Sequence, residues 1–166
     1  LVIKAVKDAV GKYGWGAGAS RLVSGNMRLH EVLEGEISKF KGKEASIVFP
    51  TGYMANIGTI SSLVSKGDLV ICDKLNHASI IDGCRLSGAD FRVYPHCDMK
   101  KLENILKKSS KYSRKLIVTD TVFSMDGDIA PLPDIVRIAH KYKAMVMVDE
   151  AHGTGVFGKR GGGVVE

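Results

Sequence analysis

The stretch VMVDEAHGTG, residues 146–155, decides the fold that we expect of this chain. The apolar run from Met145 to Val148 is typical of a strand buried on both faces, as in parallel sheets. Two carboxylates follow it, and His152 comes three residues after Asp149. Ligands of open α/β sheets bind beyond the carboxyl ends of the strands, so Asp149 is expected at a binding site. On this stretch alone, an Asp that only caps the next turn is an equally open alternative.

Strand-like and helical patterns alternate along the rest of the chain. Apolar runs predict strands at Ala45–Phe49, Leu69–Cys72, Phe91–Tyr94, Leu116–Thr119 and Ala144–Val148. Helical spacing is found at Leu1–Tyr13, 29–40, Met54–Ser65, Ala78–Ser87, Met99–Lys108 and Leu132–Tyr142, and Gly42 is a plausible helix stop. The alternation predicts an α/β fold with a mainly parallel sheet and flanking helices.

Composition indicates a soluble globular protein, with 45% hydrophobic and 25% charged residues among 166. No apolar run is long enough to span a bilayer and no signal peptide opens the chain, so neither a membrane partner nor secretion is expected. The three cysteines lack metal-site spacing, which favours reduced thiols in the cytoplasm. The chain begins with Leu1 and ends at Glu166 just after three glycines, which suggests a fragment.

Much of the net charge of +6 lies between Lys100 and Lys115. Leu102, Ile105 and Leu106 form a helical apolar stripe there, so the lysines are expected on its solvated face. A nucleic-acid partner is disfavoured, because among stacking aromatic residues only Tyr112 is interleaved. A phosphate-bearing partner of the CoA type would suit the charge, but the run does not demonstrate one.

Two motif matches are misleading. Residues 153–158 fit the dinucleotide fingerprint G-x-G-x-x-G, but they are separated from their strand and run into Lys159 and Arg160 rather than into a helix. The letters DEAH at 149–152 occur in helicases, which need an earlier phosphate loop that this chain lacks. The sequence context therefore disfavours both a dinucleotide-binding fold and a helicase.

Three further segments follow predicted strands and join Asp149. Residues 50–56 form a glycine turn into a helix, whose free amides at Gly52, Tyr53 and Met54 would bind an anion. His77 begins a helix after the second predicted strand, and residues 120–128 follow the fourth. For Met-Asp-Gly-Asp at 125–128, an ordinary hairpin turn is the alternative to a role at the site. In a parallel sheet all these segments meet at one edge, and that convergence carries more weight than any single motif.

The order of these motifs resembles the α-oxoamine synthases. The matching segments are Gly14–Asn26, Thr51–Asn56, Asn76–Ser79, Phe123–Asp128 and Asp149–Gly155, and the likeness extends over essentially the whole chain. The resemblance implies the large domain of the aspartate-aminotransferase-like, fold type I transferases, with pyridoxal 5'-phosphate (PLP) as cofactor. Residues 1–28 would be an N-terminal helix and glycine-rich segment, and 29–166 part of the PLP-binding domain, with its C-terminal part and the small domain absent.

The resemblance also implies roles for single residues. Asp149 would pair with the pyridine nitrogen and His77 would stack on the ring. Ser124 and His152 would lie near the ring hydroxyl, and the amides of Gly52 and Tyr53 would bind the phosphate. Arg21 and His30 lie in the segment that borders the substrate site in this family.

The implied reaction is the decarboxylative condensation of an amino acid with an acyl-CoA or acyl-carrier-protein thioester by a cytoplasmic homodimer. The sequence of residues 149–155 is most similar to the branch of the family whose enzymes join L-alanine to a pimeloyl thioester in biotin synthesis. Residues 76–83 fit equally the branch that joins glycine to acetyl-CoA. The family's Schiff-base lysine is not matched, since Lys159 stands in the wrong context. Truncation and a non-catalytic partner subunit both remain open.

Overall fold

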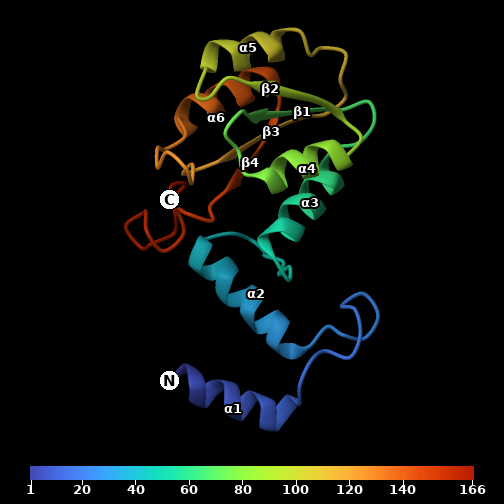
Figure 1. Ribbon diagram of the computed structural model, residues 1–166, viewed down its shortest axis with the longest axis vertical. Coiled ribbons are helices and arrows are strands. Elements are labelled where there is room, and N and C mark those ends of the chain that lie inside the picture. Colours follow the sequence, from blue (N-terminus) through green and yellow to red (C-terminus); the bar gives the residue numbers. More distant parts are fainter. The chain divides into compact units, whose positions relative to one another are not determined.

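The computed structural model describes residues 1–166, which divide into two units, Leu1–Val48 and Phe49–Glu166 (Figure 1). The division that we expected after residue 28 falls inside the first of these units. The sheet and the cavity described below belong to the second unit. No helix of the chain combines the length and the apolar character that crossing a bilayer requires.

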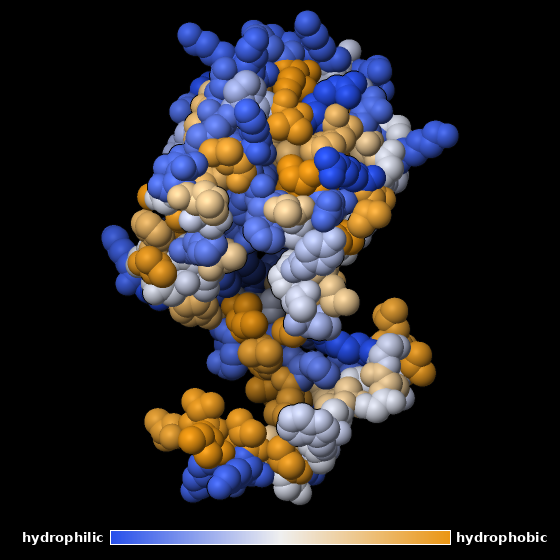
Figure 2. All heavy atoms as spheres, in the orientation of Figure 1, coloured by the Kyte–Doolittle hydropathy of each residue, from blue (hydrophilic) through white to orange (hydrophobic).

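The first unit contains the two predicted helices, α1 (Val2–Tyr13) and α2 (Arg28–Lys41). Helix α2 ends as expected at Gly42, whose φ of 61° is in the left-handed region that glycine adopts without strain. No residue of either helix is buried within the chain. Figure 2 shows apolar side chains gathered along α1, where Val2, Val6 and Val10 are exposed.

An arginine–glutamate pair organises the segment after α2. Arg21 Nη1 donates to Glu34 Oε1 (2.7 Å) and to the carbonyl oxygen of Val48 (3.0 Å), and the Val48 amide donates to Glu34 Oε1 (2.8 Å). The predicted strand Ala45–Phe49 is wrong, because none of its residues is in the sheet. The backbone groups of Val48 bond to side chains instead of to a neighbouring strand.

The second unit is built on a four-stranded parallel sheet with the order β2-β1-β3-β4. Its strands are β1 (Leu69–Asp73), β2 (Asp90–Tyr94), β3 (Lys115–Asp120) and β4 (Met145–Asp149). The register pairs Cys72 with Val118, and Asp120 with Asp149. The carboxyl ends of β3 and β4 therefore lie side by side, as the parallel arrangement predicted.

Alternate residues of the buried strands face two different cores. Val70, Cys72, Leu116 and Val118 pack with residues of α3 (Gly52–Leu63) and α4 (Ala78–Leu86). Leu69, Ile71 and Ile117 pack with residues of α5 (Met99–Lys107) and α6 (Leu132–Tyr142). Figure 1 shows the two helix pairs on opposite faces of the sheet. The three-layer α/β arrangement confirms the predicted fold, since apolar surface on both faces must be covered.

The helices of the second unit lie within two residues of the predicted bounds. In α5 the expected apolar stripe is buried at Leu102 and Leu106, while Lys100 and Lys107 on the other face are exposed. The lysine cluster is thus the solvated face of an amphipathic helix.

Candidate active site

A cavity of about 150 Å³ lies at the carboxyl ends of the strands. Six of the predicted site residues line it, from four separate segments: Gly52, Tyr53, His77, Ser124, Asp149 and His152. Asn56, Ser79, Asp120 and Ala151 complete the lining. The convergence of His77, Ser124 and Asp149 that we expected from strand topology is confirmed. Gly52 and Tyr53 also line the cavity, although the strand predicted before them is absent.

The Asp149 carboxylate is held at both oxygens. Asn56 Nδ2 donates to Oδ2 (2.8 Å), and the Ala151 amide donates to Oδ1 (2.9 Å). The main chain is held as well, because the amide and hydroxyl of Thr121 both donate to the Asp149 carbonyl oxygen (2.9 and 3.0 Å). The carboxylate is therefore fixed in direction before any ligand binds, which is the preorganisation that electrostatic catalysis needs.

A second chain of hydrogen bonds connects Asp149 to His77. Asn56 Nδ2 also donates to Ser79 Oγ (2.9 Å), which lies 2.7 Å from His77 Nδ1. The Ser79 amide donates to the same ring nitrogen (3.2 Å), so that His77 caps α4 with its side chain. Because Nδ1 accepts, the proton of a neutral His77 ring is on Nε2. Asn56 thus orients both the carboxylate and the imidazole.

Asp120 contributes a third buried polar group. It lies at the end of β3, is 7% exposed, and its Oδ2 accepts from the His77 amide (2.7 Å). Burial raises the pKa of Asp120 to about 6; the His77 amide opposes this rise and the charge of Asp149 adds to it. The protonation state of this carboxyl group therefore changes near pH 6.

The turn after β4 brings His152 to the cavity. A Cβ on Gly153 would lie 3.0 Å from Glu150 Oε1 and 3.1 Å from Thr121 Oγ1, so a larger residue here would crowd these two side chains. Glu150 Oε1 accepts from the Val164 amide (2.7 Å). Of the two neighbouring carboxylates, Asp149 lines the cavity and Glu150 binds the C-terminal segment.

The amides at the start of α3 differ from the prediction at one position. The Met54 amide is not free, because it donates to the side chain of Thr51, the N-cap of α3 (3.1 Å). Gly52 and Tyr53 line the cavity and are the remaining predicted donors. The Tyr53 hydroxyl donates to Asp82 (3.0 Å).

Arg21 and His30, the predicted substrate-binding residues, belong to the first unit. Arg21 bonds to Glu34, Val48 and Asn26. Its guanidinium and the Val48 amide hold the pKa of Glu34 below its usual range. His30 Nδ1 accepts from the Met27 amide at the start of α2 (3.0 Å). Both side chains have local partners, and their substrate role stays a prediction.

Sequence reasoning missed Asn56, Ser79 and Asp120 as site residues. All three occur in segments that were singled out for other residues. The available signal was a polar side chain at a buried position: Asn56 within an apolar helix, and Asp120 directly after an apolar strand.

Comparison with known proteins supports the family suggested by the motifs. The family model for aminotransferase class I and II matches residues 1–164. The 8-amino-7-oxononanoate synthase of Alkaliphilus metalliredigens is 59% identical over 164 residues, and 8-amino-7-oxononanoate synthase 1 of Bacillus subtilis is 54% identical over 164 residues. These alignments cover 98% and 99% of the chain but 42% of each relative. The chain thus spans about two fifths of the length of these curated relatives.

Solved structures show the same fold over nearly the whole chain. A serine palmitoyltransferase from S. paucimobilis with bound PLP and myriocin has a TM-score of 0.96 at 45% identity, covering 99% of this chain and 42% of that one. The 8-amino-7-oxononanoate synthase of Francisella tularensis has a TM-score of 0.81 at 35% identity, covering 98% and 44%. Sequence family, fold and strand-end motifs agree, and the chain therefore belongs to the aminotransferase class I and II family, among the α-oxoamine synthases.

Proposed function

We propose that this protein is a PLP-dependent acyltransferase that condenses L-alanine with a pimeloyl thioester of CoA or an acyl-carrier protein, forming 8-amino-7-oxononanoate and releasing carbon dioxide. The observation that carries the proposal is the Asp149 carboxylate, oriented at the cavity by Asn56 and Ala151. The names of the curated relatives support the choice of reaction.

The residues around the cavity fit PLP. Asp149 offers an anionic acceptor for a protonated pyridine nitrogen, and His77 offers a flat ring beside it. Gly52 and Tyr53 begin α3, a helix of 12 residues, whose N-terminal amides and dipole favour a phosphate group. Ser124 and His152 supply polar groups for the ring hydroxyl. These residues match the pyridine nitrogen, the phosphate and the ring hydroxyl of PLP.

Asp149 would act by holding a proton on the pyridine nitrogen. An ion pair at about 4 Å with an effective dielectric constant of about 20 is worth roughly 4 kcal/mol. That energy corresponds to about three pKa units, enough to keep the nitrogen protonated at neutral pH. When bound, PLP would supply an electron sink for negative charge that develops at the α-carbon of the amino acid.

Asn56 and His77 would position the cofactor without carrying its charge. Asn56 prevents the carboxylate from rotating, since it donates to Oδ2 while Ala151 donates to Oδ1. His77 is held through Ser79, so its ring is presented in one orientation. The Nε2 proton of the neutral ring leaves this nitrogen as a donor toward the substrate.

A second reaction of the same class is favoured by the structural comparison. Serine palmitoyltransferases match the chain with TM-scores of 0.96 and identities of 44–45%. A condensation that uses serine and a palmitoyl thioester is therefore the competing proposal, beside the glycine and acetyl-CoA reaction that the sequence left open. All three need the same ring chemistry, so the strand-end residues described here do not distinguish them.

Side-by-side kinetics of the full-length, PLP-loaded protein would separate these reactions. We expect kcat/KM for alanine with pimeloyl-CoA to exceed that for serine with palmitoyl-CoA and for glycine with acetyl-CoA. Relative to acetyl, pimeloyl has several additional methylenes, each worth about 0.8 kcal/mol when buried. The expected preference over palmitoyl rests instead on the names of the curated relatives. A higher value for either competitor would transfer the assignment to it. Absence of PLP binding would refute the cofactor proposal itself.

The assembly and the location of the protein are further proposals. We propose a cytoplasmic homodimer in which residues 29–166 contribute to a PLP-binding large domain. Sedimentation of the full-length protein would test the dimer, because a monomer at micromolar concentration would contradict it.

A further inference from the structure

His96, which follows β2, bridges two carboxylates, one at the end of β1 and one in the turn after β3. Its Nδ1 lies 2.9 Å from Asp73 Oδ1, and its Nε2 lies 2.7 Å from Asp128 Oδ2. Asp73 ends β1, four residues before His77, and Asp128 closes the turn that carries Ser124. One imidazole thus connects the two loops that bring His77 and Ser124 to the cavity.

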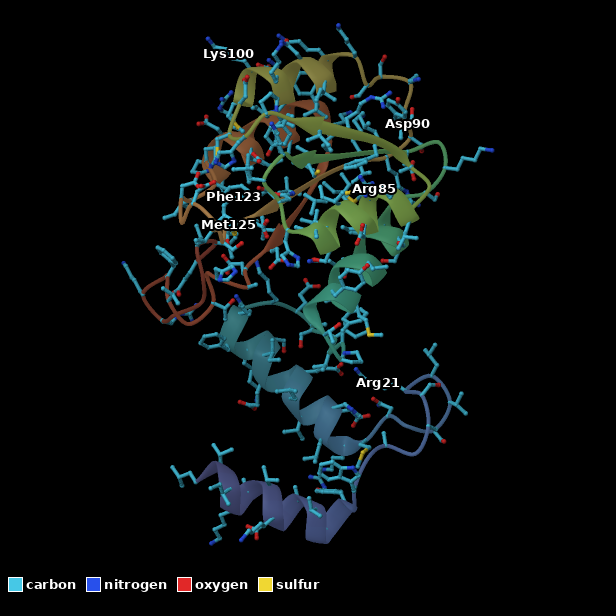
Figure 3. All side chains as sticks on the ribbon, viewed as in Figure 1. Arg21, Arg85, Asp90, Lys100, Phe123 and Met125 are labelled. Atoms are coloured by element: carbon cyan, nitrogen blue, oxygen red, sulfur yellow. The ribbon has the colours of Figure 1, made fainter.

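The same ring contacts both ends of the Ser124 turn. Phe123 packs edge-on against His96, with ring centroids 4.5 Å apart, and is 1% exposed. The Phe123 amide donates to the Asp128 carbonyl oxygen (3.0 Å), and the Gly127 amide donates to the Phe123 carbonyl oxygen (2.7 Å). Figure 3 labels Phe123 and Met125 on this turn. Ser124 therefore lies on a short loop whose two anchor residues both contact His96.

The geometry also indicates the charge of His96. Each ring nitrogen faces a carboxylate oxygen at hydrogen-bond distance, so both nitrogens donate when the carboxylates are ionised. Burial lowers the pKa of His96, but the hydrogen bonds and charges of Asp73 and Asp128 outweigh it and raise the pKa above 6.5. The Asp73 side chain is 1% exposed and also accepts from the amides of Leu75 (2.9 Å) and Cys97 (2.8 Å), whereas the Asp128 side chain is 42% exposed.

A metal site built from the same residues fits the geometry poorly. Asp73, His96 and Cys97 place possible ligand atoms within 4.8 Å of one another. However, Cys97 Sγ lies 3.8 Å from Nδ1 and 3.6 Å from Nε2, so it lies along the lone pair of neither nitrogen. Burial raises the pKa of Cys97 to about 11, which disfavours the thiolate that binds metals. The arrangement is better explained as a charged bridge.

We propose that His96 is a positioning residue: as an imidazolium it holds the Ser124 turn against the end of β1 and so fixes Ser124 and His77 relative to each other at the cavity. The link to the cofactor rests on the function proposed above. The bridge itself does not, because its contacts are present in the protein without a ligand.

The bridge is tested first in the full-length protein without PLP. We expect His96→Phe, which keeps an aromatic ring but removes both hydrogen bonds, to speed amide exchange at Phe123 and Gly127 about tenfold, the equivalent of about 1.4 kcal/mol of local stability. His140→Phe, at an exposed position of α6, is the matched control and should leave these amides unchanged. Asp128→Asn, which removes one charge at nearly constant volume, gives the same test if His96→Phe fails to fold.

Two observations of the unliganded protein would overturn the bridge. The first is an amide-exchange rate at Phe123 and Gly127 of His96→Phe equal to that of the control variant. If His96→Phe does not fold, the same comparison is made with Asp128→Asn. The other is a ¹⁵N spectrum of the wild-type protein at pH 6 in which His96 carries one ring proton. A uniform rise in exchange across β1 and β3 would also count against it, since that pattern indicates global destabilisation.

PLP titration then tests the link to the site. We expect His96→Phe to weaken PLP binding about tenfold relative to His140→Phe, because Ser124 and His77 lose their relative positions. An unchanged affinity together with faster exchange of the turn would refute the positioning role but leave the bridge. If the wild-type protein itself does not bind PLP, the proposed function fails while the exchange experiment still decides the bridge.

Discussion

The Asp149→Asn substitution in the full-length enzyme tests the central part of the site. Asparagine keeps the size of the side chain but removes the charge that would hold the pyridine nitrogen protonated. It can also accept from only one of the two groups that now donate to Asp149, the Asn56 amide group and the Ala151 amide. The lost ion pair is worth roughly 4 kcal/mol at an effective dielectric constant of about 20. Part of that energy supports binding and part supports the developing charge.

We therefore expect kcat to fall at least about 100-fold, which corresponds to about 3 kcal/mol of transition-state stabilisation. Steady-state kinetics with saturating PLP would measure it, and the absorbance of bound PLP would report the protonation of the ring. Asp134→Asn on α6 is the control, because Asp134 is exposed and pairs only with Arg137 of the same helix. Near-normal activity of Asp149→Asn in a folded, PLP-loaded protein would show that the carboxylate is a structural cap.

Three further predictions concern stability, measured by denaturant unfolding of the full-length protein. Burial raises the pKa of Asp120 from 3.8 to about 6, so the folded state binds a proton here more tightly than the unfolded state does. The free energy of unfolding should therefore fall as pH rises from about 4 to 6, and Asp120→Asn should remove up to about 3 kcal/mol of that fall. Identical pH profiles of the variant and the wild type would contradict this. Ile135 is 0% exposed, and Ile135→Ala should lower the free energy of unfolding by about 2–5 kcal/mol. Its control, Val136→Ala at a position that is 54% exposed, should change that energy by less than about 0.5 kcal/mol. Equal effects of the two substitutions would refute the assigned core face of α6. Gly153→Ala should destabilise the folded protein by about 1–3 kcal/mol, because the added Cβ would crowd Glu150 and Thr121. Gly35→Ala within α2, where no atom lies in the way of a Cβ, should stabilise it by about 0.5–1 kcal/mol. The opposite order would contradict the contacts described.

The sequence by itself determined the layered architecture and the edge of the sheet where the site lies. Hydrophobic periodicity is a local property, and it identified every strand of the sheet and each of its helices. The site residues Asp149, His77 and Ser124 follow different strands, yet they could be placed together in advance. The reason is geometric, since the carboxyl ends of parallel strands must share one edge.

Only the tertiary structure decided which side chains orient the predicted ones. Asn56 is hydrogen-bonded to Asp149, 93 positions further along the sequence, and His96 connects Asp73 to Asp128. No periodicity or motif in the sequence predicts these contacts. The same limit explains the wrong strand at residues 45–49, because a strand exists only where a neighbour offers its backbone, and Val48 is bonded to Arg21 and Glu34 instead. Local pattern sets which residues are buried, while the partner of each buried polar group depends on the packing of distant segments.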